Sequence, residues 1–212
     1  MKGHIQFPYR LYLVISADAC KGKDMLKVAE QAILGGVDIV QLREKNLPLE
    51  VFLKKAQQLR EITEKYAIPL IINDNAAVAF RINAAGVHVG NNDIQPMVLR
   101  QQDYYNDKII GYSIEYLTQL ENEQTTVSDY LGISPVFRTD TKTNTVTEWG
   151  LDGVRKIRQL TQKPLVAIGN IHVNNAKAVV DAGADCIAVV SAICSADNPQ
   201  KAAYELKNEI IK

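Results

Sequence analysis

The chain has 212 residues, of which 47% are hydrophobic and 23% are charged, a composition typical of a globular protein with a substantial core. Its 24 basic and 24 acidic residues cancel, so the charge of the whole molecule attracts neither nucleic acid nor an anionic membrane. We therefore expect any anionic ligand to be held by a local cluster of donors.

The first apolar run, LYLVISA, follows Lys2 and Arg10 and precedes Ala17–Cys20, which superficially resembles a lipoprotein signal. The run is short for a signal peptide, contains a tyrosine and is followed by Asp18, so we interpret it as a first core strand. No stretch approaches the roughly 20 apolar residues of a membrane span. The three cysteines lack metal-binding spacing, which favours buried, reduced thiols. These features predict a cytoplasmic protein.

Short apolar runs alternate along the chain with longer segments of helical period. We predict strands at Leu11–Ser16, Ile39–Arg43, Leu70–Asn73, Gly86–Val89, Lys108–Ser113, Tyr130–Ser134, Leu165–Gly169 and Cys186–Ser191. We predict helices at Asp24–Gly35, Leu49–Tyr66, Ala76–Asn83, Ile94–Gln102, Tyr116–Glu123, Leu151–Leu160, Asn174–Ala182 and Pro199–Ile211. Asp24 can cap the first helix, and Pro48 and Pro199 suit first helical turns.

Strands and helices that alternate in this way predict an α/β fold, a (β/α)₈ TIM barrel formed by a single domain of residues 1–212. A doubly wound open sheet is the alternative, but it usually has fewer repeats, and no Gly-x-Gly-x-x-Gly motif follows the first strand. A long polar segment, residues 137–150, follows the sixth strand. Its length and polarity motivate the hypothesis of a lid that closes over substrate.

A barrel places its functional groups at the carboxyl ends of its strands. Polar residues gather at those positions here: Gln41–Lys45, Asn73 and Asp74, Gly90–Asp93, Ser113, Thr139–Lys142, Ile168–Asn170 and Val189–Ala192. Each motif alone has an ordinary explanation as a turn, a helix cap or a solvated charge. Their joint placement at consecutive strand ends predicts one site.

The residue types at these strand ends point to phosphate chemistry. Arg43, Lys45 and Lys142 are cations, and an arginine can grip phosphate oxygens with two parallel hydrogen bonds. Asp74 and Asp93 are hard oxygen ligands, which suit a Mg²⁺ ion that takes its other oxygens from water and a substrate phosphate. This half of the face is therefore expected to bind a phosphorylated substrate with a metal.

The loops after the seventh and eighth strands are a frequent phosphate site in this fold, and Gly169 permits a close backbone approach there. Two phosphorylated substrates could thus be held side by side. His88 lies between Val87 and Val89 within a predicted strand. We interpret it as a packed, hydrogen-bonded imidazole rather than a catalyst.

The chain resembles the thiamine phosphate synthase family in motifs that run in order from Leu11 to Ile193: QLREK, INDNAAVA, AGVHVGNND, GYS, DYLGISPVFRTDTK, PLVAIGNI and GADCIAVVSAI. The resemblance implies a barrel transferase with Mg²⁺ as cofactor. It would join 4-amino-2-methyl-5-hydroxymethylpyrimidine diphosphate to a thiazole (carboxy)phosphate, giving thiamine phosphate and pyrophosphate. The implied mechanism is dissociative: pyrophosphate leaves first, and the thiazole nitrogen attacks the resulting pyrimidine cation.

The resemblance also implies roles for individual residues. The pyrimidine diphosphate would be bound by Gln41, Leu42, Arg43, Glu44, Lys45, Asn73, Ser113 and Lys142. Four of these would act in catalysis: Arg43, Lys45, Lys142 and Ser113. The thiazole phosphate would contact Thr139, Asp140, Thr141, Gly169, Val190 and Ser191, and the metal would bind Asp74 and Asp93. The partners are small-molecule substrates, and whether the chain forms a homo-oligomer stays open.

Three positions depart from the family pattern. Glu115 stands where the family usually has histidine, Ser134 precedes Pro135 where glycine is usual, and Asn170 replaces the second glycine of an IGGI motif. Asn170 brings a side chain to the thiazole phosphate loop, but its backbone N–H remains. We therefore expect tuning rather than loss of that site.

Two alternatives share the fold. A related thiazole tautomerase is an isomerase that needs an acid/base residue, typically a histidine, near Ser134 and Pro135, and it does not need the metal and diphosphate set. A catalytically silent barrel that binds thiamine precursors would keep the site without turnover. The complete set of carboxylates and cations favours the synthase.

Overall fold

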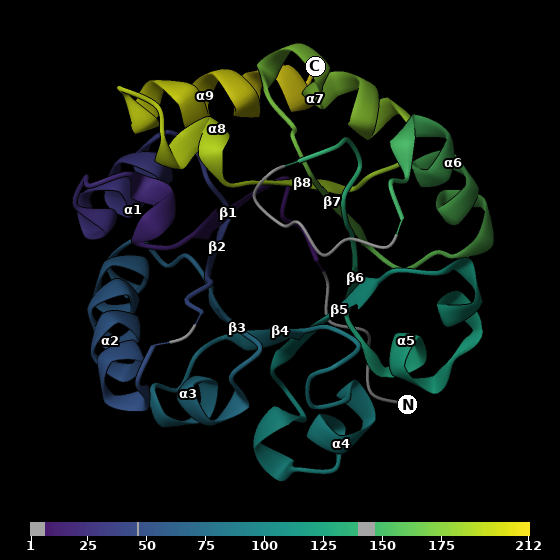
Figure 1. Cartoon of the computed structure of the whole chain (residues 1–212), viewed down its shortest axis with the longest axis horizontal. Helices are drawn as coiled ribbons and strands as arrows, with labels where there is room; N and C mark the ends of the chain where they lie inside the picture. Colours follow the sequence, from purple (N-terminus) through teal and green to yellow (C-terminus); the bar gives the residue numbers. More distant parts are fainter. Residues whose placement is uncertain (1–6, 46, 140–146) are drawn as a thin grey trace.

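The computed structural model describes residues 7–45, 47–139 and 147–212, and its parallel strands close into a barrel in sequence order (Figure 1). The strands are β1 (Leu11–Ile15), β2 (Ile39–Leu42), β3 (Leu70–Asn73), β4 (Gly86–Val89), β5 (Ile109–Ile114), β6 (Tyr130–Ile133), β7 (Leu165–Ile168) and β8 (Cys186–Val189). Tyr12 pairs with Ile39 and Leu13 with Val189, so β1 joins β2 on one side and β8 on the other. The predicted (β/α)₈ barrel is confirmed.

All of the predicted strands are present, and each end lies within two residues of its predicted place. The strands could be found because both of their faces are covered, which makes each a continuous apolar run. One layer of side chains fills the barrel interior: Tyr12, Val14, Ile39, Ile71, Ile109, Tyr130, Val166, Cys186 and Ala188. A larger apolar layer lies between the strands and the helices. The extent of a single domain over residues 1–212 stays a prediction.

The helices surround the barrel (Figure 1): α1 (Met25–Leu34), α2 (Leu49–Lys65), α3 (Ala76–Arg81), α4 (Pro96–Arg100), α5 (Glu123–Val127), α6 (Gly150–Leu160), α7 (Val173–Asp181), α8 (Ser191–Cys194) and α9 (Pro199–Ile210). Short 3₁₀ helices lie between them: η1 (Asp18–Cys20), η2 (Asp103–Tyr105) and η3 (Leu117–Glu121). Within the described ranges, no helix is long and apolar enough to cross a membrane. Cys20, Cys186 and Cys194 are buried free thiols, in agreement with the sequence prediction.

The predicted helix at Tyr116–Glu123 is wrong. Most of that segment is the 3₁₀ helix η3, and α5 begins only at Glu123. The side chain of Asn122 accepts a hydrogen bond from the Thr125 N–H at 2.9 Å, so it caps a new helix instead of continuing the old one. The sequence does not predict α8 either, because a single turn shows no helical period.

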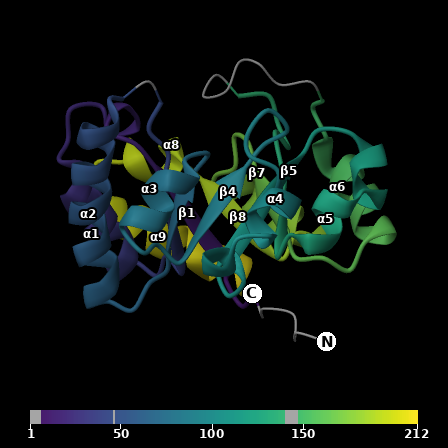
Figure 2. The ribbon, with the colours of Figure 1, turned by 90° about the horizontal axis from the view of Figure 1, so that it is seen from below.

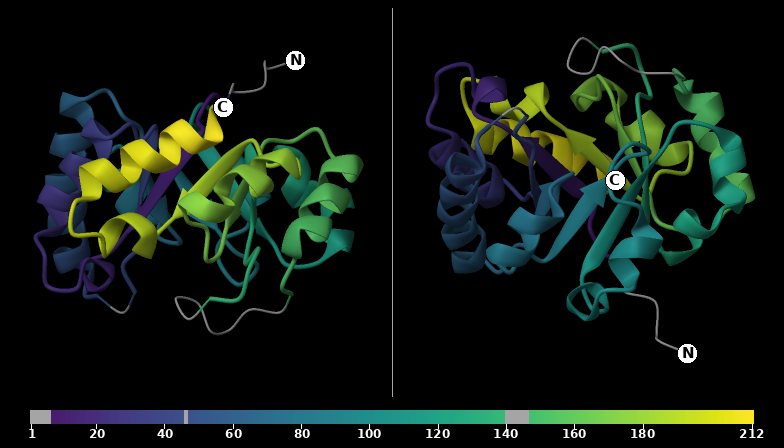
Figure 3. Two further views of the ribbon diagram at one scale, coloured as in Figure 1. Left: turned by 90° about the horizontal axis from the view of Figure 1, so that it is seen from above. Right: turned by 60° about the horizontal axis from the view of Figure 1, so that its bottom comes forward.

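The barrel has two unlike faces. Seen from the side, the loops that follow the strands lie on one face, which we call the carboxyl-end face, and the end of α9 lies on the opposite, amino-end face (Figures 2 and 3). The amino-end face carries three aspartates that directly precede strands: Asp38, Asp129 and Asp185. Each accepts hydrogen bonds from backbone N–H groups of the neighbouring strand, at Leu11 (2.9 Å), Ile110 (2.7 Å) and Leu165 (2.8 Å), respectively.

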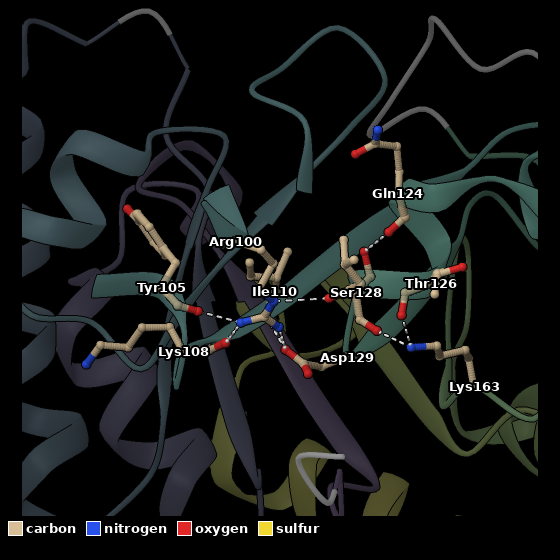
Figure 4. Close-up of polar contacts among 10 residues, drawn as sticks. Arg100, Tyr105, Lys108, Ile110, Gln124, Thr126, Ser128, Asp129 and Lys163 are labelled. Atoms are coloured by element: carbon tan, nitrogen blue, oxygen red, sulfur yellow. Dashed lines mark hydrogen bonds and ion pairs between the residues drawn. The ribbon is translucent and has the colours of Figure 1, made fainter. Parts of the chain in front are cut away.

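Each of these aspartates is also paired with a helix cation: Lys207, Arg100 and Arg158, respectively. Figure 4 shows the cluster around Arg100, whose guanidinium donates to the carbonyls of Tyr105 and Lys108 and to the Asp129 carboxylate. Nearby, the Lys163 ammonium donates to the carbonyls of Thr126 and Ser128, each at 2.7 Å (Figure 4). At the amino ends of these strands, the charged side chains therefore have hydrogen-bond or ion-pair partners within the chain.

Candidate functional site

A cavity of about 280 Å³ opens at the carboxyl-end face. Most of the predicted site residues line this cavity: Gln41, Arg43, Lys45, Asn73, Asp74, Asp93, Ser113, Thr139, Gly169, Val190 and Ser191. Three further predicted residues, Asp140, Thr141 and Lys142, lie outside the described residues, as does much of the predicted lid at residues 137–150. The strand ends therefore converge as the sequence predicts, from seven different strands or the loops that follow them.

Two residues of the QLREK motif do not reach this cavity. Leu42 is fully buried in the apolar layer outside the barrel. Glu44 accepts hydrogen bonds from the Lys55 ammonium at 2.8 Å and the Ala17 N–H at 3.1 Å, and lines a neighbouring cavity beside β1. Successive side chains of a strand point to opposite faces, so an unbroken motif of five residues cannot all face one ligand. Only Gln41, Arg43 and Lys45 do.

Asp74 and Asp93 form the electrostatic centre of the cavity. Asp74 follows β3 in a left-handed backbone conformation with φ of 61°, which aspartate tolerates better than most residues. Its N–H donates to the His88 carbonyl at 2.8 Å. Asp93 accepts a hydrogen bond from the Gly90 N–H at 2.8 Å. Both carboxylates are thus held by short loops at the ends of adjacent strands.

Burial raises the pKa of Asp74 to about 6, and the neighbouring Asp93 carboxylate, within hydrogen-bonding reach, adds to the rise. Lys45 and Arg43 act in the opposite direction. Two carboxylates held so close repel each other unless a proton or a cation lies between them. The carboxylate pair therefore favours a proton or a cation at this point.

The donor set fits a magnesium ion. Among the described residues, no group of three or more histidine, cysteine, aspartate or glutamate side chains is arranged to hold a metal. A cation between Asp74 and Asp93 would therefore have few protein ligands, and would take its remaining oxygens from water and a bound phosphate. Mg²⁺ in particular keeps several waters and binds through one or two carboxylates.

Glu115, one of the departures from the family pattern, lines the cavity beside β5. Its carboxylate accepts a hydrogen bond from the Asn91 amide at 2.6 Å, and Asn91 in turn accepts one from the Tyr112 hydroxyl at 2.6 Å. The buried Gln119 side chain accepts from the Glu115 N–H at 2.7 Å. This position is therefore built into the rim of the cavity by several contacts.

The rim at β6 and β7 explains two other features of the sequence. Gly169 has φ of 123°, and a Cβ there would lie 2.6 Å from the Cβ of Pro135. The glycine is thus required by packing of the loop after β6, besides any approach of a ligand. Asn170 has φ of 49° and an exposed side chain. Asparagine is one of the few non-glycine residues that adopt this conformation readily, which explains why it can replace a glycine.

Sequence reasoning missed the inner floor of the cavity. His88 Nδ1 lies 2.9 Å from the Tyr130 hydroxyl, and His88 Nε2 lies 2.9 Å from Ser113 Oγ. The Tyr130 hydroxyl also contacts Tyr12, which is bonded to Gln41. The expected packed, hydrogen-bonded imidazole agrees with this geometry. The inward period of two along β1 and β6 could have marked both tyrosines as interior residues, but not their contact with each other or with His88.

The thiamine monophosphate synthase family model matches residues 11–193. The chain belongs to this family. Among thiamine monophosphate synthase relatives, the thiamine-phosphate synthase of Albidiferax ferrireducens is 44% identical over 201 residues, covering 95% of this chain and 91% of the relative. The thiamine-phosphate synthase of Leptospira biflexa is 43% identical over 203 residues, covering 94% and 96%, respectively. The solved thiamine phosphate pyrophosphorylase from Pyrococcus furiosus superposes with a TM-score of 0.85 at 31% identity, covering 96% of each chain.

Proposed function

We propose that the chain is a thiamine phosphate synthase, a transferase that joins the aminopyrimidine diphosphate to the thiazole phosphate and releases pyrophosphate. The observation that carries the proposal is the cavity itself. In a chain of this family, it gathers the paired carboxylates Asp74 and Asp93 with the cations Arg43 and Lys45. Such a site is suited to a diphosphate and the metal that accompanies it.

The leaving diphosphate would lie over β2 to β4, with one oxygen toward Ser113 on β5. Arg43 and Lys45 line that part of the cavity, and their donors would neutralise charge that develops on pyrophosphate as the carbon–oxygen bond breaks. Lys142 is proposed to add a third cation. When bound between Asp74 and Asp93, Mg²⁺ would supply further neutralisation of the same leaving group.

The pyrimidine ring would lie deeper, against the buried side chains of Gln41 and Asn73 and beside Ser113. A dissociative displacement needs no nucleophilic side chain, because pyrophosphate departs before the thiazole nitrogen attacks. It needs the two substrates to be aligned at a short distance and water to be kept away. A cavity closed below by the barrel interior supports both requirements.

The thiazole phosphate would be held at the rim after β6 to β8. Thr139, Gly169, Val190 and Ser191 line this part of the cavity, and Asp140 and Thr141 are proposed to complete it. The position is next to the diphosphate half, so the two substrates would meet across the cavity mouth.

The test is pyrophosphate release from the purified protein given both substrates, with and without Mg²⁺. We expect release that requires the metal and the thiazole phosphate, with thiamine phosphate appearing in equal amount. Binding of either substrate without release would contradict the proposal. The tautomerase and the silent binder gain no support from the relatives, whose names are those of the synthase. The cytoplasmic location stays a prediction, and whether the chain forms a homo-oligomer stays open.

A further inference from the structure

A chain of hydrogen bonds crosses the barrel interior beneath the cavity. Gln41 Nε2 lies 2.9 Å from the Tyr12 hydroxyl, which lies 3.0 Å from the Tyr130 hydroxyl. The Tyr130 hydroxyl lies 2.9 Å from His88 Nδ1, and His88 Nε2 lies 2.9 Å from Ser113 Oγ. The chain joins five strands, and its two ends, Gln41 and Ser113, both line the cavity. The cavity floor therefore links two ligand-facing groups that are far apart in the sequence.

The barrel makes room for this chain. A Cβ at Gly111 would lie 2.1 Å from Tyr130 Cζ and 2.5 Å from His88 Nδ1, and a Cβ at Gly132 would lie 2.9 Å from His88 Cε1. The neighbouring strands β5 and β6 thus have a glycine at each point where the Tyr130 and His88 rings lie against the backbone. From the amino-end side, Phe7 packs on Tyr130 with ring centroids 4.7 Å apart. Phe7 therefore supports the Tyr130 ring from the amino-end side.

With a neutral His88, only two proton directions leave no hydroxyl proton of Tyr12 or Tyr130 without an acceptor inside this chain. A hydroxyl has one proton, and a neutral imidazole donates from one nitrogen and accepts at the other. If the Gln41 amide donates to Tyr12, then Tyr12 donates to Tyr130 and Tyr130 donates to His88 Nδ1. His88 Nε2 then donates to Ser113. Burial raises the pKa of both tyrosines well above the usual value, so both keep the proton that this order needs.

The direction of the protons determines whether Gln41 and Ser113 present a donor or an acceptor to the cavity. Gln41 turns its carbonyl oxygen, an acceptor, toward the cavity, and Ser113 has its own proton left to donate. In the reverse direction, Gln41 would present its N–H groups and Ser113 would present only an acceptor. Because the groups are linked in series, one end cannot change without the other unless a buried tyrosine proton loses its acceptor, which is costly. The two directions are mutually exclusive.

We propose that Tyr12, Tyr130 and His88 are positioning residues that hold the Gln41 carbonyl toward the cavity, and that this selects pyrimidine diphosphates with an exocyclic amino group over those with an oxo group. This inference rests on the proposed function. The amino group donates to the Gln41 carbonyl, while Ser113 donates to a diphosphate oxygen. In the reverse direction, the Gln41 N–H groups would face the substrate amino group, donor against donor. The Ser113 oxygen, an acceptor, would face the negatively charged diphosphate.

An oxo analogue meets the same site as a mismatch. Its exocyclic oxygen faces the Gln41 carbonyl, so both acceptors lack a donor in a buried place. Turning the Gln41 amide would relieve this, but Tyr12 would then have to reverse its proton, and the rest of the chain would follow. A site built to hydrogen-bond one group rejects the analogue that lacks it far better than an apolar pocket does.

The first test needs no substrate. The ¹⁵N shifts of the His88 imidazole report its tautomer, and the signals can be assigned by their loss in His88→Asn. We expect a proton on Nε2 and none on Nδ1 in the wild-type protein, with a change in this state in Tyr130→Phe. A proton on Nδ1 in the wild-type protein would overturn the direction, whatever the protein's activity.

The second test compares affinity for the 4-amino and 4-oxo pyrimidine diphosphates, measured by calorimetry with Mg²⁺ and without the thiazole. In Tyr130→Phe and in Tyr12→Phe we expect the preference for the amino compound to fall by roughly tenfold or more. The matched control is Tyr105→Phe, which removes another buried hydroxyl that bonds to the Ala76 carbonyl outside the site. It should leave the preference unchanged.

The outcomes are distinct. An unchanged preference in both site variants would overturn the selection, even if turnover fell. If the wild-type protein bound neither pyrimidine, the proposed function and the selection would both fail, while the imidazole shifts would still decide the direction of the chain. Equal loss of preference in Tyr105→Phe would show a general effect of a lost hydroxyl and would overturn the positioning role.

Discussion

The two faces of the barrel treat their carboxylates in opposite ways. On the amino-end face, Asp38, Asp129 and Asp185 each bond to the backbone of a neighbouring strand and pair with a helix cation. On the carboxyl-end face, Asp74 and Asp93 lie against each other, and the pKa of Asp74 is raised to about 6 by burial and this neighbour. Charges are satisfied within the chain on one face and left for a ligand to satisfy on the other.

This difference separates residues that hold the fold from residues that hold substrate. Aspartates that are equally close to strand ends differ in role because of their partners, which sequence position alone does not give. Substitutions of charged residues on the carboxyl-end face should lower turnover without lowering stability. Substitutions on the amino-end face should lower stability without lowering turnover.

The largest effect is expected for Asp74→Ala. The change removes one of two proposed metal ligands, so turnover should fall on the order of a thousandfold. Relief of the repulsion with Asp93 offsets the cost of alanine at a φ of 61°, so stability should change little. The measurements are pyrophosphate release at saturating Mg²⁺ and thermal unfolding. A variant with near wild-type turnover would sink the assignment.

Lys142→Ala should lower turnover by about a hundredfold or more, because the proposed cation no longer neutralises the leaving pyrophosphate. The matched control is Lys163→Ala on the opposite face, which removes donors to two backbone carbonyls. The control should unfold more easily but turn over at the wild-type rate at low temperature. Equal rates in the two variants would count against the role of Lys142.

Asp129→Ala should lower the free energy of unfolding by about 2 kcal/mol, because Arg100 and the Ile110 N–H lose their partner in a largely buried place. Urea unfolding measures this change. The KM values for both substrates should stay within a factor of about two of the wild type, since a group on the amino-end face touches no ligand. A selective rise in the KM for one substrate would contradict the claim that the amino-end face affects stability alone.

The smallest effect is expected for Asn170→Gly, which restores the glycine usual in the family. The backbone already has φ of 49°, so glycine needs no rearrangement, and stability should change by less than about 1 kcal/mol. The KM for the thiazole phosphate should hardly change. A large fall in that KM would show that the asparagine side chain obstructs the phosphate loop.

The strands and the convergence of their carboxyl ends could be predicted because both follow from local patterns. Doubly covered strands are apolar throughout, and a parallel barrel puts every strand end on one face. The motif QLREK was harder to interpret, because a motif of consecutive residues does not show that side chains along a strand alternate between two faces. This alternation turns Leu42 and Glu44 away from the cavity. A period of two along β2 would have separated them.

The floor of the cavity could not be predicted from motifs. Tyr12 and Tyr130 meet through hydroxyls although they are 118 positions apart, and no local pattern marks either as more than a core residue. Their contact arises from the register that places β1, β4 and β6 around one interior. Local signals give the elements, while side-chain partners across the barrel require the folded chain.

The most direct test of the contrast between the faces is a Mg²⁺ titration of pyrophosphate release in the wild-type protein and in Asp74→Asn, which keeps the shape and removes the charge. We predict saturable dependence on Mg²⁺ in the wild type and almost no release by the variant at any concentration. Wild-type release that persists in excess chelator, or full activity of the variant, would contradict the claim that the carboxylate pair is completed by a cation.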